Sequence, residues 1–246
     1  MQKRLTGIQI RGEESGLYEV RDGLSALLDA LDGSDLAKHR LGNWCSALTI
    51  FDPGIRKIFA AFVGMPNNEI YFTRHSHTDK AYVRTPTTAG GEILEVEMEP
   101  RDVTLKDAAI GYYGQKPAKL LSMTHSRPRF AQWLTHVSKE MQEKKQEEDC
   151  PKMRIYNLAG IPMMVNVVEG YLDAVVEVSG QKCHDVVPGF VIALRAKAVL
   201  KDLSNHYITE EEIAARLRDP SQTFSYVLAC NEALASELVE LLQTVS

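Results

Sequence analysis

The segment LLDALDGSDL (residues 27–36) places two carboxylates beside one glycine, directly after an apolar run. Asp29 and Asp32 are separated by two residues, and Gly33 and Ser34 follow at once. Hard cations such as Mg²⁺ take oxygen ligands, often a few carboxylates together with water and a substrate phosphate. On a tight turn after a strand, both aspartates can point into one pocket. The segment therefore predicts a metal site, while an ordinary turn remains the alternative.

The same turn offers groups that can meet a phosphate. The carbonyl of Leu31, between the two aspartates, can add an oxygen ligand to a metal. Gly33 allows close backbone approach or an unusual dihedral. If Ser34 starts a helix, the free amides of Gly33 and Ser34 point at whatever lies there, which favours a phosphate. The segment thus contains both halves of a metal–phosphate site.

Two further segments place carboxylates next to glycines. GEES carries Glu13 and Glu14 at the end of a short expected strand, and QKCHDVVPG carries Asp185 at the start of an expected helix. Each has an ordinary explanation when taken alone, because a loop is often acidic and an aspartate at a helix start is usually an N-cap. Their order along the chain is more informative than any one of them.

GEES, then DALDGS, then HDVVPGFVIALRAKAVLKDL resembles the pattern of the inositol monophosphatase superfamily. In that family of magnesium-dependent, lithium-sensitive phosphomonoesterases the pattern runs GEE, then DPxDG(T/S), then WDxAAG followed by a helix. The resemblance covers most of the chain. It implies an α/β (α+β) fold, with αβαβα layers, a mostly antiparallel first sheet and a smaller α/β second half. It also implies hydrolysis of a phosphate monoester of inositol, a sugar or a related small molecule by a metal-activated water.

The resemblance assigns roles residue by residue. Metal ligands would be Glu13, Asp29, Asp32 and Asp185 with the carbonyl of Leu31, holding two or three Mg²⁺ ions, with Mn²⁺ as an alternative. Glu13 and Ser34 match the pair that orients and activates the attacking water. Residues matching phosphate or substrate contacts are Asp32, Gly33, Ser34, Ala159, Glu177 and Asp185. Among these, Glu177 is one residue out of register with the family's substrate-binding glutamate.

The sequence also departs from the family. Ala30 replaces a proline, His184 a tryptophan and Pro188 an alanine. Family members carry a long segment before GEE, with helices, a hairpin and a threonine–aspartate loop near the metals, whereas residues 1–11 precede it here. An open apolar sheet face is therefore expected. Either the chain is a truncation with weak activity, or a second copy covers the face; family members often dimerise, which favours a homodimer.

Composition limits the remaining possibilities. The 246 residues are 44% hydrophobic and 25% charged, which is typical of a globular protein. A net charge of -5 argues against a nucleic-acid binder. The N-terminus has no signal-like apolar core and no apolar stretch is long enough to span a membrane. The four cysteines form no CxxC pair, so we expect reduced thiols in a cytoplasmic protein. The expected partner is a small phosphorylated substrate.

Hydrophobic patterns predict a largely antiparallel meander to about residue 100, followed by alternating strands and helices. This change divides the chain into a metal- and phosphate-binding half (1–115) and a substrate-determining half (116–246). Residues 118–124 read as a strand, and the 127–152 insertion is expected to decorate the surface.

Two other functional readings remain open from the sequence. The chain would be a catalytically weak or inactive relative acting as a binding or partner module, or a plain metal- or sugar-phosphate-binding module. Within the enzyme reading, the candidate substrates are inositol phosphates, fructose 1,6-bisphosphate and phosphoadenosine nucleotides.

Overall fold

A computed structural model describes residues 9–12, 23–86, 91–114, 116–145, 147–158, 160–219 and 221–243. The first part of the chain forms a seven-stranded sheet whose strands follow in sequence order. Its strands are β1 (Gln9–Gly12), β2 (Ser25–Asp32), β3 (Cys45–Asp52), β4 (Lys57–Gly64), β5 (Ile70–Arg74), β6 (His77–Thr85) and β7 (Glu92–Val96). Only the β1–β2 pair is parallel, so the expected antiparallel meander is confirmed.

The second sheet has five strands in the order β11-β12-β10-β8-β9. They are β8 (Ala109–Tyr112), β9 (Arg154–Asn157), β10 (Ala174–Lys182), β11 (Val199–Asp202) and β12 (Thr223–Ala229). β10 pairs in parallel with β8 and antiparallel with β12. This mixed sheet, interleaved with helices, is the α/β half that the alternating pattern predicts.

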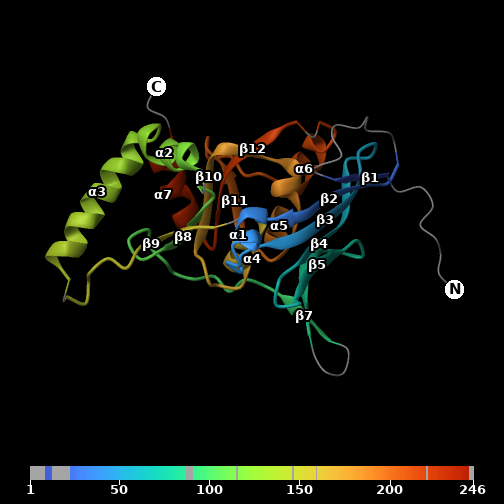
Figure 1. Cartoon of the computed structure of the whole chain (residues 1–246), viewed down its shortest axis with the longest axis horizontal. Coiled ribbons are helices and arrows are strands. Elements are labelled where there is room, and N and C mark those ends of the chain that lie inside the picture. The colour runs from blue at the N-terminus through green and yellow to red at the C-terminus, as the bar shows by residue number, and fades with distance from the viewer. Residues whose placement is uncertain are drawn as a thin grey trace.

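Seven helices accompany the two sheets in the described residues. They are α1 (Ser34–Lys38), α2 (Pro117–His125), α3 (Pro128–Glu143), α4 (Gly160–Val168), α5 (Val187–Arg195), α6 (Glu210–Arg216) and α7 (Glu232–Leu242). α4 and α5 lie between the sheets and contact both, while α2 and α7 pack on the far face of the second sheet and α3 packs on them (Figure 1). The layers therefore run sheet, helices, sheet, helices, which confirms the α/β fold class; the outermost helical layer of the expected αβαβα order is absent from the described residues.

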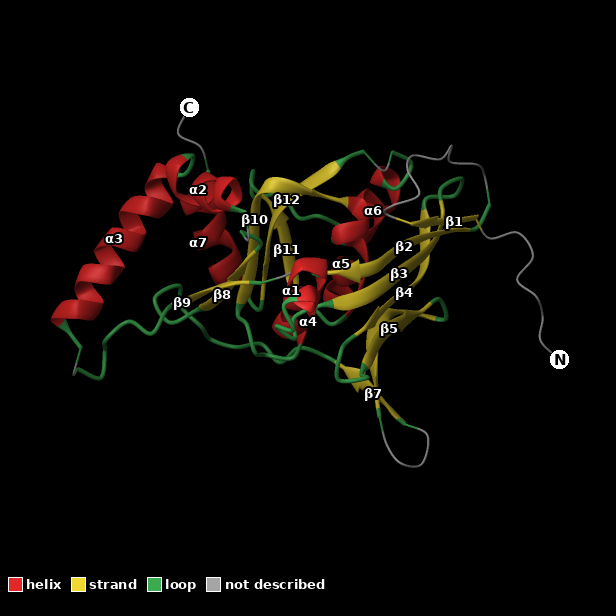
Figure 2. Ribbon diagram, viewed as in Figure 1, coloured by secondary structure: helices red, strands yellow, loops and turns green. Residues whose placement is uncertain are grey.

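The outer face of the seven-stranded sheet carries no packed helix from the described part of the chain (Figure 2). Leu48, Ile50, Phe62 and Phe72 lie on this face and are only half-buried. The rings of Phe62 and Phe72 stack with their centroids 6.2 Å apart. We call these four side chains the outer apolar face.

One element differs from its sequence-based expectation. Residues 118–124, read as a strand, lie in the helix α2. Only Met123 is buried there, whereas Leu120 and Leu121 are each 51% exposed. A short apolar run has no decisive period, and Pro117 in the first turn is compatible with a helix start. The 127–152 segment, which was expected to decorate the surface, is mostly the helix α3, which projects from the body of the molecule (Figure 1).

Candidate active site

The end of β2 places both aspartates of the DALDGS segment in the interior. Asp29 is 1% exposed and Asp32 is 6% exposed. Residues three apart in a regular strand face opposite sides of a sheet. Here Asp29 pairs with Ala47 and Asp32 with Cys45, so one extra residue is inserted between them as a bulge. The bulge brings both carboxylates to the buried face, and it leaves Leu31 at the edge with 40% of its surface exposed.

The turn after β2 has the geometry that requires glycine. Gly33 has φ 80° and ψ 31°, in the left-handed region, and it caps α1. Its carbonyl accepts a hydrogen bond from the amide of Ala37 at 2.9 Å. Ser34, the first residue of α1, is exposed. The expected turn, glycine conformation and helix start are thus all present.

The third aspartate arrives from the second half of the chain. Asp185 ends the 3₁₀ turn η2 (Cys183–Asp185), directly before α5. One of its carboxylate oxygens accepts from the amide of Lys182 at 3.3 Å, and the other lies 3.1 Å from Nε2 of His184. The turn packs against the end of β2, which brings Asp185 to the same site as Asp29 and Asp32.

The N-terminus of α4 closes the site on a further side. The amide of Ile161 donates to Oδ2 of Asp32 at 2.6 Å, across 129 positions of sequence. Among the described residues no cationic side chain forms an ion pair with Asp32. Burial, followed by the charges of Asp29 and Asp185, raises the pKa of Asp32 to about 8. Its surroundings therefore disfavour the charged form of the Asp32 carboxyl.

This donor set fits a hard divalent cation. The charges of Asp29 and Asp185 act on the buried carboxylate of Asp32, and an external cation would relieve that repulsion. Among the described residues no group of three or more His, Cys, Asp or Glu side chains is placed to hold a metal ion. Glu13 and Glu14 lie outside the described residues, as does Ala159. The three aspartates would thus supply part of a coordination sphere.

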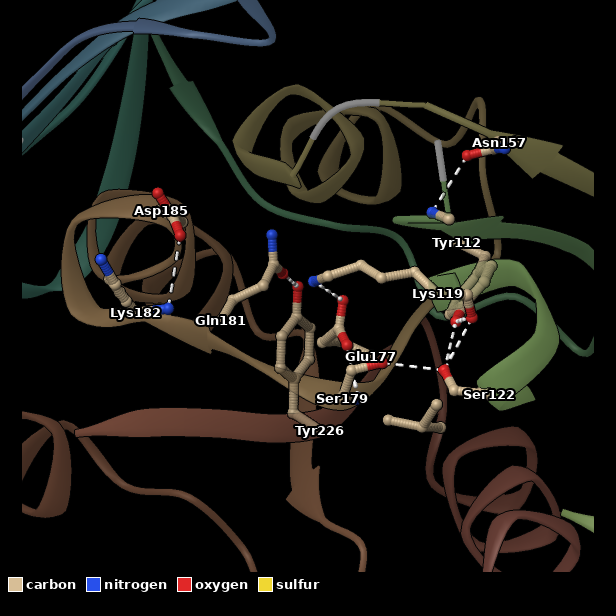
Figure 3. A network of polar contacts seen from close by, with 12 residues as sticks. Tyr112, Lys119, Ser122, Asn157, Glu177, Ser179, Gln181, Lys182, Asp185 and Tyr226 are labelled. Atoms are coloured by element: carbon tan, nitrogen blue, oxygen red, sulfur yellow. Dashed lines mark hydrogen bonds and ion pairs between the residues drawn. The ribbon is translucent and has the colours of Figure 1, made fainter. Parts of the chain in front are cut away.

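Glu177 occupies a different position from the aspartates. It is fully buried in β10, where its Oε1 accepts from the amide of Ser179 at 2.6 Å. Its Oε2 lies 3.4 Å from Nζ of Lys119, which is also over the ring of Tyr113 (Figure 3). The predicted contact between Glu177 and a substrate stays a prediction, and in this structure Lys119 lies against its carboxylate.

A large bulge in β10 explains the register of Glu177. Glu177 pairs with Tyr226, whereas Gln181 pairs with Phe224, so four steps along β10 match two along β12. Gly180, with φ 86°, lies inside this bulge. A Cβ at that position would come within 2.8 Å of Oγ1 of Thr223. The bulge places two extra residues between Glu177 and Gln181 relative to β12.

Sequence reasoning did not identify several residues that border the site. Gln181, Tyr226, Tyr113 and Lys119 come from β10, β12, the end of β8 and α2. Charges of Asp32 and Asp185, after burial, raise the pKa of Tyr113 to about 12, so its ring lies beside the acidic site. Gln181 precedes Asp185 by four positions, and this closeness in sequence was the only sign that Gln181 could border the site.

The cysteines take no visible part in this site. All four are free thiols, as predicted. Cys183, next to His184, is fully buried, and burial raises its pKa to about 12. A thiol with a raised pKa is a poor nucleophile, so the environment of Cys183 does not favour nucleophilic catalysis.

No helix in the described part of the chain has both the length and the apolar character needed to cross a bilayer.

Comparisons with known proteins place the fold. No protein-family model and no curated protein sequence matches the chain. Solved structures do match. Inositol monophosphatase II from Staphylococcus aureus is 21% identical, with a TM-score of 0.62 over 95% of this chain and 73% of that one. A Pyrococcus horikoshii protein with similarities to inositol-1 monophosphatase is 18% identical, with a TM-score of 0.64 over 97% and 78%.

An IMPase/NADP phosphatase gives the same result, at 16% identity and a TM-score of 0.65 over 97% of this chain and 74% of that one. These likenesses extend over almost all of the described structure, in both sheets. At such identities they establish the architecture and leave the chemistry to be argued from the site. The chain therefore has the fold of the inositol monophosphatase-type enzymes.

Proposed function

We propose that this chain hydrolyses a phosphate monoester of inositol, a sugar or a related small molecule, with Mg²⁺ as cofactor. The observation that carries the proposal is that the charges of Asp29 and Asp185 act on the buried carboxylate of Asp32, with which no cationic side chain of the described residues forms an ion pair. A structural neighbour, the IMPase/NADP phosphatase, was solved with Mg²⁺ and phosphate, and another with D-inositol-1-phosphate. Both findings support a metal and a small phosphorylated substrate for this chain.

The residues of the chain would divide the work as follows. Asp29, Asp32 and Asp185, with the carbonyl of Leu31 and the carboxylate of Glu13, would hold two or three ions. Bound there, Mg²⁺ supplies Lewis-acid chemistry: it lowers the pKa of water and stabilises negative charge on the leaving oxygen. Glu13, assisted by the hydroxyl of Ser34, would orient the attacking water and accept its proton.

The remaining residues would bind the substrate. The amides of Gly33 and Ser34 would face the phosphate, and the carboxylates of Asp32 and Asp185 would accept hydrogen bonds from substrate hydroxyls. The backbone at Ala159, just before α4, would add a further contact. These assignments follow the resemblance stated above, and the positions of Asp32, Gly33 and Asp185 at one site support them.

A panel of phosphate esters tests the proposal. Inositol phosphates, fructose 1,6-bisphosphate and phosphoadenosine nucleotides would be incubated with the protein, and released phosphate would be measured with and without magnesium and with added lithium. We expect steady release from at least one ester that requires magnesium and falls with lithium. Absence of release from every ester would favour the alternative, an inactive relative that keeps the site for binding.

A further inference from the structure

Gln181 contains a buried hydrogen-bond donor that the fold does not use. The side chain is 2% exposed, and among the described residues its Nε2 has no hydrogen-bond partner. Leaving a buried polar group unpaired costs about 1–3 kcal/mol. Buried donors in folded proteins are nearly always paired, so an orphaned one calls for an explanation. A ligand that accepts from this amide is one such explanation.

The amide nitrogen points at the acidic site. A Cβ added to Gly160 would lie 2.8 Å from Nε2 of Gln181, 3.2 Å from the carbonyl oxygen of Asp185 and 3.6 Å from Oδ2 of Asp32. The amide therefore packs against the first residue of α4, on the same side as the Asp32 carboxylate. The glycine makes this approach possible, because any side chain there would collide with the amide.

Tyr226 fixes the direction of the amide. Its hydroxyl, fully buried in β12, donates to Oε1 of Gln181 at 3.0 Å. With the carbonyl oxygen bound to Tyr226, the amide nitrogen points the other way, as Figure 3 shows. The β10 bulge described above places Gln181 opposite Phe224, with its side chain beside Tyr226.

We propose that Gln181 recognises the alcohol part of the substrate, by donating from Nε2 to a hydroxyl oxygen of a polyol phosphate. The inference rests on the proposed function and adds a specificity-determining residue to it. A hydroxyl can accept from Gln181 and at the same time donate to the neighbouring carboxylate of Asp32. A phosphoryl oxygen can only accept, and the adjacent carboxylates would repel it. The donor and acceptor side by side therefore match a hydroxyl and disfavour the phosphate itself.

Binding of two non-hydrolysable probes tests this assignment. One probe is a polyhydroxylated alkylphosphonate, and the other is methylphosphonate, which has no hydroxyl on its carbon. Calorimetric titration in magnesium would compare the wild type with Gln181→Leu, and with Gln132→Leu as a matched control at an exposed position in α3. We expect Gln181→Leu to weaken the polyol probe about tenfold, the loss of one hydrogen bond, and methylphosphonate less than twofold. The control should change neither.

Equal weakening of both probes, or no weakening of either, would overturn the assignment, and so would a wild type that binds neither probe. If Gln181→Leu does not fold, Tyr226→Phe replaces it, since this change removes only the hydroxyl that orients the amide. It should weaken the polyol probe about threefold and leave methylphosphonate unchanged; any other pattern contradicts the proposal. The titration needs no turnover, so a protein that binds the polyol probe selectively but releases no phosphate would refute hydrolysis and retain this role.

Discussion

Two buried acidic positions in this molecule have opposite surroundings. Glu177 is fully buried, but Lys119 lies 3.4 Å from its carboxylate and the amide of Ser179 donates to it. Asp32 is nearly as buried, yet its neighbours are Asp29 and Asp185, and its pKa is raised to about 8. A fold can bury a carboxylate at low cost when it supplies the countercharge. Around Asp32 the described residues supply further carboxylates and no ion pair, and our proposal of a cation site rests on this difference.

The largest expected effect is on turnover at the proposed site around Asp32. Glu13→Gln should fold normally and lower turnover by about 10²- to 10⁴-fold, because it removes the proposed base and keeps the phosphate contacts at Gly33 and Ser34. Steady-state kinetics would separate turnover from substrate binding. Near-normal turnover would assign the base elsewhere, with Glu14 as the first candidate.

Magnesium affinity should depend on the carboxylates around Asp32 and not on Glu177. Asp29→Asn, Asp32→Asn and Asp185→Asn each remove an anionic oxygen ligand. Loss of a residue that only supports a ligand weakens metal affinity by up to about 100-fold, so loss of a ligand itself should weaken magnesium binding by at least about 100-fold. Asp35→Asn is the control, since Asp35 is exposed in the first turn of α1. Calorimetric titration measures all four, and unchanged affinity in the three variants would remove the metal assignment.

At Glu177, loss of the neighbouring cation should lower the stability of the protein rather than its magnesium affinity. Lys119→Met would leave Glu177 buried without its cation, and breaking a buried pair in this way costs about 3–5 kcal/mol. The expected fall in Tm is roughly 10 °C, at 2–4 °C per kcal/mol for a chain of this size. Lys116→Met, at an exposed position just before α2, should change Tm little. A Tm that stays near the wild-type value in Lys119→Met would show that the ion pair is not important for stability.

The pH dependence of the metal effect follows from Asp32. Its pKa is about 8 in the folded chain, against about 3.9 for an aspartate in an unfolded chain. Between these values the folded state binds more protons, so the free energy of unfolding falls as pH rises from about 4 to 8. Magnesium would relieve this loss. A magnesium concentration 100 times the Kd at pH 8 should add about 2.7 kcal/mol to the free energy of unfolding at pH 8. The same concentration should add clearly less at pH 5. Thermal unfolding at both pH values checks this; an equal gain at both would contradict it.

The smallest expected effect concerns association through the outer apolar face. We predict that two copies associate there, because half-buried Phe62 and Phe72 would otherwise stay in contact with water. Light scattering should give a dimer for the wild type and a monomer for Phe62→Glu. A monodisperse wild-type monomer with full activity would count against this association.

The turn that carries Asp29, Asp32 and Gly33 could be anticipated from the sequence because its residues carry a local signal. Asp29, Asp32 and Gly33 lie on one turn, and their arrangement depends on chain geometry within a few residues. Even there, the β2 bulge that turns both aspartates to one face is visible only in the register with β3. The ordered triple of acidic segments supplied the long-range link to Asp185.

The substrate side could not be predicted in the same way. The positions of Glu177 and Gln181 depend on how many residues of β10 oppose β12, and on Tyr226, which lies far along the chain. Lys119 reaches Glu177 from a segment, 118–124, that was read as a strand and is the helix α2. The countercharge of Lys119 and the unpaired donor of Gln181 arise from tertiary contacts, so no local sequence pattern predicts them.

One measurement tests the central claim most directly, namely that Asp29, Asp32 and Asp185 form a cation site. Magnesium would be titrated into the wild-type protein at pH 7 in two buffers with different enthalpies of ionisation. Because Asp32 is mostly protonated at that pH, binding should release close to one proton per site, and the observed heat should differ between the buffers. Saturable binding with this proton release is the predicted result. No saturable heat in either buffer would contradict the account.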